Sequence, residues 1–189
     1  MNVDHLVGLA AEEGGVTIVT GFPASGKSTI AQRLAADIDA LLIDKDTFAP
    51  GLEESVMSEL VGRPHDRDSD TYRRVVSPHL YKAIVDQAFA AARFAPVVID
   101  APFLGFIRAA ADHDLPLAQY LVELASMTAP RIRTAWVATD PAQIKERMIA
   151  RAAERDLGKL ADWHAYRVNV LENGTAELAR TAVDFLIAN

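Results

Sequence analysis

Short apolar runs alternate along this chain with longer stretches in which apolar residues recur every three or four positions. Such runs are typical of buried parallel strands, and the spaced positions between them are typical of helices with one buried face. We expect five strands, at residues 16–20, 40–43, 97–100, 131–138 and 168–171. Alternating strands and helices predict a three-layer α/β/α sandwich around a mostly parallel five-stranded sheet.

Helical spacing is clear at both ends of the chain and in its middle. It predicts helices over residues 1–13, 28–35, 52–60, 71–93, 117–124, 140–156 and 175–188. Pro78 lies inside one of these segments, so we expect it to kink that helix or to occupy the first turn of a new one. No repeat or Pro/Gly/Ser-rich linker divides the chain, and residues 1–189 are expected to form a single domain.

Composition and charge exclude several kinds of site and argue against some partners. The chain has no cysteine, which excludes disulfides, thiolate metal sites and cysteine nucleophiles. No apolar run approaches the roughly 20 residues that span a bilayer, and residues 1–5 lack the basic region of a signal peptide, so we expect a cytoplasmic protein without a membrane partner. The net charge of −7 argues against a nucleic-acid partner. A monomer and a homodimer both stay open.

Residues 21–28, GFPASGKS, match the phosphate-loop pattern G-x-x-x-x-G-K-[ST] at every fixed position. A β-branched run precedes the motif and a helical pattern follows it, which is the context that this motif requires. Backbone N–H groups of such a loop converge on phosphate oxygens at a helix N-terminus. The motif therefore predicts binding of a nucleoside triphosphate. The residues expected to bind it are Gly21, Ala24, Ser25, Gly26, Lys27, Ser28 and Thr29.

Carboxylates follow two of the predicted strands. Asp44 and Asp46 come after the second strand and Asp100 ends the third, so all three are expected at the ligand-binding edge of the sheet. The Ser28 hydroxyl and Asp100 are candidate ligands for Mg²⁺. Asp100 is followed by Ala101 rather than a water-activating glutamate, which favours transfer to an acceptor over hydrolysis. Capping of a turn is the alternative role for Asp46.

These motifs resemble the small P-loop kinases, among them shikimate kinase, gluconate kinase, chloramphenicol phosphotransferase and zeta-toxin-like relatives. The resemblance implies that Asp46 accepts the proton of the acceptor hydroxyl, with Asp44 as metal helper or alternative base. It implies that residues 47–74 cover the acceptor. Candidate acceptor contacts are Arg63, His65, Arg67, Arg73, Phe103, Phe106 and Arg108. A solvated loop for the basic residues, and a core role for the aromatic ones, are the alternatives.

The same resemblance implies an arginine-bearing lid at residues 147–160 and an adenine contact near Asn173. Arg147, Arg151 and Arg155 are four residues apart, so on one helix they would share a face. Arg151 and Arg155 are the preferred pair for neutralising the transferring phosphoryl group. Arg147 is expected to contact the nucleotide, with a structural role as the alternative. A solvated face stabilised by neighbouring acids is the alternative.

The sequence thus predicts a kinase that uses ATP and Mg²⁺ to phosphorylate a hydroxyl of a small molecule. ATP is favoured over GTP because no N-K-x-D guanine-reading motif is present. A polynucleotide 5′-hydroxyl kinase or a nucleotide-sugar kinase would use the same chemistry on a larger acceptor. A nucleotide-dependent switch or ATPase module is the alternative from another class.

Overall fold

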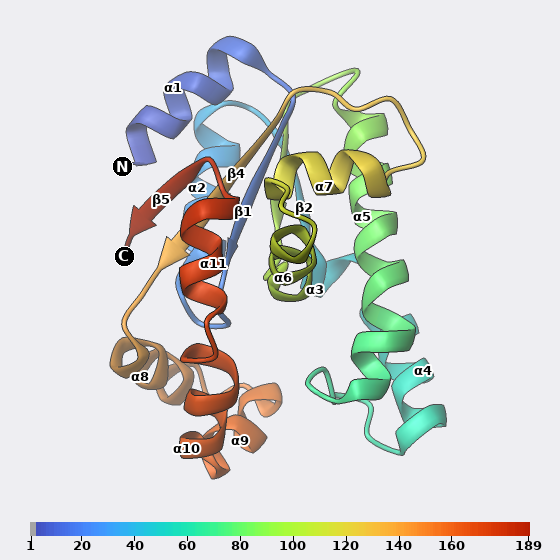
Figure 1. Cartoon of the computed structure of the whole chain (residues 1–189), viewed down its shortest axis with the longest axis vertical. Coiled ribbons are helices and arrows are strands. Elements are labelled where there is room, and N and C mark those ends of the chain that lie inside the picture. Colours follow the sequence, from blue (N-terminus) through green and yellow to red (C-terminus); the bar gives the residue numbers. More distant parts are fainter. Residues whose placement is uncertain (1–2) are drawn as a thin grey trace.

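The computed structural model describes residues 3–189, and its centre is a sheet of five parallel strands in the order β2-β3-β1-β4-β5 (Figure 1). The strands β1 and β3 are buried along their whole length, as their β-branched, apolar sequences predict. The strand bounds are β1 (Val16–Gly21), β2 (Leu41–Asp44), β3 (Val97–Asp100), β4 (Ile132–Ala138) and β5 (Phe185–Ala188).

Helices cover both faces of the sheet. Helices α1 and α2 contribute to an apolar core on one face, and α5, α6, α7 and α11 contribute to a larger core on the other. The three-layer fold is confirmed, and the sheet is wholly parallel. The helix bounds are α1 (Val3–Glu13), α2 (Lys27–Asp37), α3 (Lys45–Phe48), α4 (Pro50–Val61), α5 (Ser77–Ala91), α6 (Leu104–Asp112), α7 (Leu117–Leu124), α8 (Pro141–Arg151), α9 (Glu154–Ala161), α10 (Trp163–Tyr166) and α11 (Thr175–Ala182), with π-helical turns at η1 (Tyr72–Val76) and η2 (Arg167–Leu171).

The end of the chain differs from the sequence prediction. Residues 168–171, predicted as the last strand, lie in the π-helical turn η2, and the helix predicted over 175–188 ends at Ala182. The fifth strand is β5, which pairs with β4. The Asp184 carboxylate accepts hydrogen bonds from the N–H and hydroxyl of Thr134, at 2.8 and 2.9 Å, and so fixes β5 beside β4. The strand prediction for residues 168–171 and the helix prediction for residues 183–188 were wrong because this contact joins residues 50 positions apart.

Two helix breaks bear on the site. A π-helical turn precedes α5, and Pro78 occupies the first turn of α5, as one of the two sequence interpretations predicted. The arginine-bearing helix is not continuous: α8 ends at Arg151, Ala152 adopts a left-handed φ of 47°, and α9 begins at Glu154. The prediction that Arg155 shares a helix face with Arg147 and Arg151 was therefore wrong.

Parallel register brings the predicted carboxylates to one edge of the sheet. Asp44 is the register partner of Asp100, and Asp100 is that of Val19, two residues before the phosphate loop. Below this edge, Figure 1 shows α8, α9 and α10 on one side and α4 with the lower end of α5 on the other. Between residues 3 and 189, no helix has the length and apolar character needed to cross a bilayer.

Candidate active site

The phosphate loop, residues 21–28, connects β1 to α2 and depends on two glycines. Gly21 and Gly26 have φ values of 152° and 91°. A Cβ on Gly21 would lie 2.8 Å from Ser25 Oγ, and one on Gly26 would lie 2.1 Å from Asn189 Nδ2, so neither position accommodates a side chain without rearrangement. Over the loop lies a cavity of about 220 Å³, and it is lined by Ala24, Gly26, Lys27, Ser28, Thr29, Arg147 and Arg151.

Three side chains from separate parts of the chain donate hydrogen bonds to the carbonyl oxygen of Ser25. It accepts hydrogen bonds from Arg147 Nη1 at 2.8 Å, Thr139 Oγ1 at 2.8 Å and Asn189 Nδ2 at 2.7 Å. These contacts tie the loop to the residue after β4, to α8 and to the residue after β5, and they place Arg147 beside the predicted nucleotide site. Sequence reasoning missed Asn189 because its neighbourhood depends on β5, which was not predicted.

Lys27, Ser28 and Asp100 meet at the inner end of the loop. Lys27 Nζ lies 3.7 Å from Asp100 Oδ1, an oxygen that is buried and has no hydrogen-bond partner. Burial raises the pKa of Asp100, against the lowering effects of Lys27 and of a hydrogen bond with Ser28. A buried carboxylate oxygen without a partner is the kind of group that a bound cation would satisfy.

The donor set fits Mg²⁺ held together with a nucleotide. Ser28 and Asp100 are adjacent, and Asp44 neighbours Asp100 across the β2–β3 register. Within residues 3–189, no three His, Asp or Glu side chains form a complete metal site. Mg²⁺ typically takes only one or two carboxylates and completes its shell with phosphate oxygens and water, so two carboxylates and a hydroxyl suffice.

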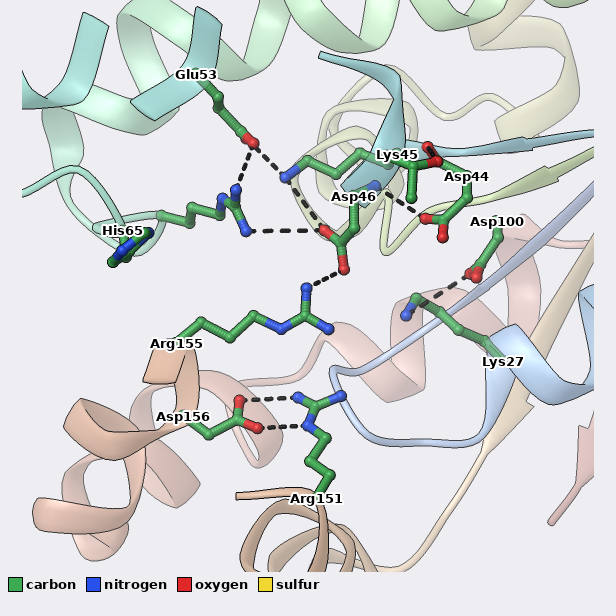
Figure 2. A network of polar contacts seen from close by, with 12 residues as sticks. Lys27, Asp44, Lys45, Asp46, Glu53, His65, Asp100, Arg151, Arg155 and Asp156 are labelled. Atoms are coloured by element: carbon green, nitrogen blue, oxygen red, sulfur yellow. Dashed lines mark hydrogen bonds and ion pairs between the residues drawn. The ribbon is translucent and has the colours of Figure 1, made fainter. Parts of the chain in front are cut away.

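Asp44 and Asp46 have different surroundings. Asp44 Oδ1 accepts a hydrogen bond of 2.9 Å from the Asp46 N–H and so caps α3. The capping role that the sequence allowed for Asp46 therefore belongs to Asp44, and the Asp46 carboxylate faces the interior of the site (Figure 2). Burial tends to raise the pKa of Asp46, but nearby cations outweigh it and lower that pKa. These cations are Arg155, Lys45, Lys27 and Arg67.

A buried group of polar side chains lies next to Asp46, and we call Lys45, Glu53, Arg67 and Tyr72 the Glu53 cluster. Glu53 is only 2% exposed, and its carboxylate lies 2.6 Å from Lys45 Nζ and 2.8 Å from Arg67 Nη2. The Tyr72 hydroxyl donates a hydrogen bond to the same carboxylate. Lys45 and Arg67 in turn lie 3.6 and 3.9 Å from Asp46 Oδ1, so the cluster borders the candidate base.

Burial and pairing shift the pKa values of this cluster. Burial lowers the pKa of Lys45, although the hydrogen bond to Glu53 opposes the change. Burial and the same carboxylate raise the pKa of Tyr72, which keeps its hydroxyl protonated as a donor. Glu53 was not identified from the sequence, because the spacing of Leu52 and Leu60 predicts only a helix there; both leucines are exposed.

The predicted lid arginines both pair with carboxylates. Arg151 Nε and Nη2 lie 2.5 and 2.8 Å from the two oxygens of the fully buried Asp156. Arg155 Nη1 donates to Asp46 Oδ2, so a residue of α9 reaches across to the strand end (Figure 2). Lys159 adds a second link to the acceptor side, 3.3 Å from Asp68.

Several predicted residues lie outside the Glu53 cluster, among them His65, which lies beside Glu54 and Glu154. Arg63 and Arg73 are exposed and pair with Asp66 and Asp70. Phe103 is fully buried in an aromatic group with Tyr81 and Phe106. Arg108 donates to Thr175 Oγ1 at 2.8 Å and to the Asn173 carbonyl at 3.0 Å, and neither it nor Asn173 lines the cavity over the phosphate loop.

Comparison with known families and structures agrees with this geometry. A family model described as an AAA domain matches residues 16–170. No curated protein matches the chain.

Three solved structures share the fold at low identity. A putative fructose transport system kinase from Silicibacter sp. TM1040 has a TM-score of 0.55 at 16% identity, with 99% of each chain covered. A sugar kinase from Janibacter sp. HTCC2649 has a TM-score of 0.54 at 16% identity, covering 93% of this chain and 84% of that one. Shikimate kinase from Acinetobacter baumannii has a TM-score of 0.54 at 14% identity, covering 97% and 87%. At these identities the likeness establishes the P-loop kinase fold.

Proposed function

The chain belongs to the AAA domain family, and on this premise we propose that it is an ATP- and Mg²⁺-dependent phosphotransferase that phosphorylates a hydroxyl of a small molecule. The observation that carries the proposal is that Lys27, Asp100 and Asp46 lie close together at one edge of the sheet. The first two lie 3.7 Å apart, and the charge of Lys27 also acts on Asp46. A phosphate-binding lysine and a candidate base thus border one site. Three structures with this fold, a sugar kinase, a shikimate kinase and a putative fructose transport system kinase, support the same class.

The phosphate loop and its neighbours would hold the nucleotide. The amides of residues 21–28 and the Lys27 ammonium bind the phosphates, and Arg147 and Arg151 border the same cavity. Ser28 and Asp100 would hold Mg²⁺, with Asp44 beside them. When bound, that ion neutralises charge on the β- and γ-phosphate oxygens.

Asp46 would orient the acceptor hydroxyl and accept its proton. The proton moves to the carboxylate as the hydroxyl oxygen bonds to phosphorus and the bond between phosphorus and the ADP oxygen breaks. The depressed pKa of Asp46 keeps the group ionised at neutral pH, as a proton acceptor must be. Arg155 would leave Asp46 and, with Arg151, neutralise the moving phosphoryl group.

The test is phosphorylation of a panel of sugars, polyols, nucleosides, antibiotics and 5′-hydroxyl oligonucleotides with ATP and Mg²⁺, followed by mass spectrometry. We expect one class of small alcohol to be phosphorylated by the wild type and not by Asp46→Asn. Phosphorylation of oligonucleotides alone would favour the polynucleotide kinase instead. ATP hydrolysis that no acceptor alters, and that Asp46→Asn leaves unchanged, would reject the kinase in favour of a switch or ATPase module.

A further inference from the structure

The cations nearest Asp46 on the acceptor side already have an anionic partner. Lys45 and Arg67 both lie within 2.8 Å of the Glu53 carboxylate. The side chains are sequestered from solvent: Lys45 is 5% exposed, Arg67 17% and Glu53 2%. An anion arriving at this position would have to compete with a carboxylate that is built into the fold.

The charges of this group balance. Asp46 and Glu53 supply two negative charges, and Lys45 and Arg67 supply two positive charges. Arg155 is the further cation in contact with Asp46, and the proposed function assigns it to the triphosphate. Among the exposed arginines of the covering segment, Arg63 and Arg73 are paired with acids of their own loop, and the charge of Arg74 acts on Asp70.

A second observation concerns the space next to the cluster. A cavity of about 240 Å³ lies between α4 and α5, and the Glu53 side chain forms part of its wall. No lysine or arginine contributes to that wall. Most of its surface is apolar, and it is supplied by Phe48, Leu52, Val56, Val75 and Leu80. This cavity can accommodate apolar groups, and His79 is the one basic side chain among its lining residues.

We propose that the acceptor is an uncharged alcohol, and that Glu53 sets this selectivity by neutralising Lys45 and Arg67. The proposal rests on the proposed function for the roles of Asp46 and Arg155. A carboxylate-bearing acceptor would lose hydration beside Asp46 and gain no free cation in return, which disfavours its binding. Glu53 is a specificity-determining residue that acts through the two cations, because its own carboxylate is buried beneath them.

The test measures binding of a simple anion and does not require the acceptor to be known. Sulfate is titrated by calorimetry into the full chain in the presence of Mg²⁺ and a non-hydrolysable ATP analogue. Three proteins are compared: the wild type, Glu53→Gln, and the control Glu54→Gln, which removes a partly exposed carboxylate one residue further along α4. All three proteins retain the same phosphate loop, so sulfate that binds to the loop contributes equally to each titration and does not affect the comparison.

We expect Glu53→Gln to bind sulfate at least about tenfold more tightly than the wild type or Glu54→Gln. Adding Arg67→Gln to Glu53→Gln should abolish the gain, because it restores the balance of charge. Equal affinities in Glu53→Gln and Glu54→Gln would overturn the proposal. If circular dichroism shows that Glu53→Gln does not fold, the wild type decides: sulfate binding that Arg67→Gln removes would overturn the proposal, and its absence would support it.

These outcomes are separate from those of the acceptor panel. A sulfate difference between Glu53→Gln and Glu54→Gln, together with ATP hydrolysis that no acceptor alters and that Asp46→Asn leaves unchanged, would reject the kinase and leave the charge balance standing. Phosphorylation of a carboxylate-bearing alcohol in preference to its uncharged counterpart would reject the selectivity and leave the kinase standing.

Discussion

Arg155, on the short helix α9, donates a hydrogen bond to the carboxylate of Asp46 at the end of β2, 109 positions earlier in the chain. Arg155 is the cation proposed to neutralise the phosphoryl group, and Asp46 is the carboxylate proposed to accept the proton of the acceptor. In this structure the two side chains are paired with each other. The two roles are compatible only if Arg155 moves when nucleotide binds. If the proposed function is correct, the pair would connect closure of the predicted lid with release of the proposed base.

Replacing Arg155 with glutamine should raise the pKa of Asp46 in the nucleotide-free protein. Burial alone raises that pKa, and Arg155 is the largest of the influences that lower it. Carbon-13 NMR of the aspartate carboxyl groups across a pH titration measures the change. Arg151→Gln is the matched control, because Arg151 pairs with Asp156 and should leave Asp46 unchanged. A pKa of Asp46 that is the same in the wild type and Arg155→Gln would refute this account of the pair.

The same pair gives a pH dependence of stability with a definite sign. The folded pKa of Asp46 lies below the unfolded value of about 3.9, so ionised Asp46 stabilises the fold above that pH. This contribution is lost as the pH falls through the folded pKa. Urea denaturation should therefore show that Arg155→Gln is less stable than the wild type at neutral pH, with a difference that shrinks below about pH 4. A difference independent of pH would point to packing instead.

Asp46→Asn should reduce phosphoryl transfer by roughly 10² to 10⁴-fold, the usual contribution of a general base. Affinity for the nucleotide should change far less, because the phosphate loop is untouched. Asp44→Asn is the informative comparison, since an asparagine oxygen can still cap α3. Steady-state rates with product detection measure both variants. If Asp44→Asn shows the larger loss in kcat at saturating Mg²⁺, Asp44 is the base and the assignment of Asp46 is wrong.

Local patterns account for what was predicted correctly. The phosphate loop is a contiguous motif whose glycines, lysine and serine are specified by the backbone geometry that they create, so residues 21–28 were identifiable from sequence alone. Parallel strands end at one edge, and strand prediction was therefore enough to bring Asp44, Asp46 and Asp100 to that edge. The roles of these residues stay predictions.

Long-range contacts account for what was missed. The position of β5 depends on Asp184 bonding to Thr134, and no local pattern distinguishes residues 185–188 from 168–171 as the fifth strand. The burial of Glu53 depends on Lys45, Arg67 and Tyr72, which come from separate elements. A buried charge is stable only when its partners are in place, so the apolar spacing that predicted a helix over residues 52–60 could not single out Glu53.

Replacing Lys45 with methionine should destabilise the fold by about 3–5 kcal/mol, because it leaves Glu53 buried with one counter-charge fewer. The double variant Lys45→Met/Glu53→Met should recover most of that loss, since removing both charges removes the desolvation penalty as well. Chemical denaturation of both variants measures the coupling. Lys82→Met is the control: Lys82 pairs with Asp86 at 2.6 Å nearer the surface, and its loss should cost about 1 kcal/mol or less. Equal losses for the two lysine variants would contradict the special role of the buried cluster.

Gly26→Ala should weaken ATP binding by more than the loss of folding stability alone would explain. The φ of 91° strains any residue with a side chain by about 1–3 kcal/mol, and the new Cβ would displace Asn189 and press on Arg147, 3.1 Å away. Both side chains hold the Ser25 carbonyl, so their displacement should loosen the loop and weaken binding by about tenfold or more. Fluorescence titration with a labelled ATP analogue measures the affinity, and thermal unfolding measures the stability.

Gly8→Ala serves as the control for the glycine substitution. Gly8 lies on the exposed side of α1, a Cβ there meets no atom within 4 Å, and alanine favours the helix by about 0.5–1 kcal/mol. This variant should bind the analogue as the wild type does and unfold at a slightly higher temperature. Wild-type affinity in Gly26→Ala would mean that Asn189 and Arg147 adapt without disturbing Ser25, and the three hydrogen bonds to its carbonyl would then have no part in nucleotide binding.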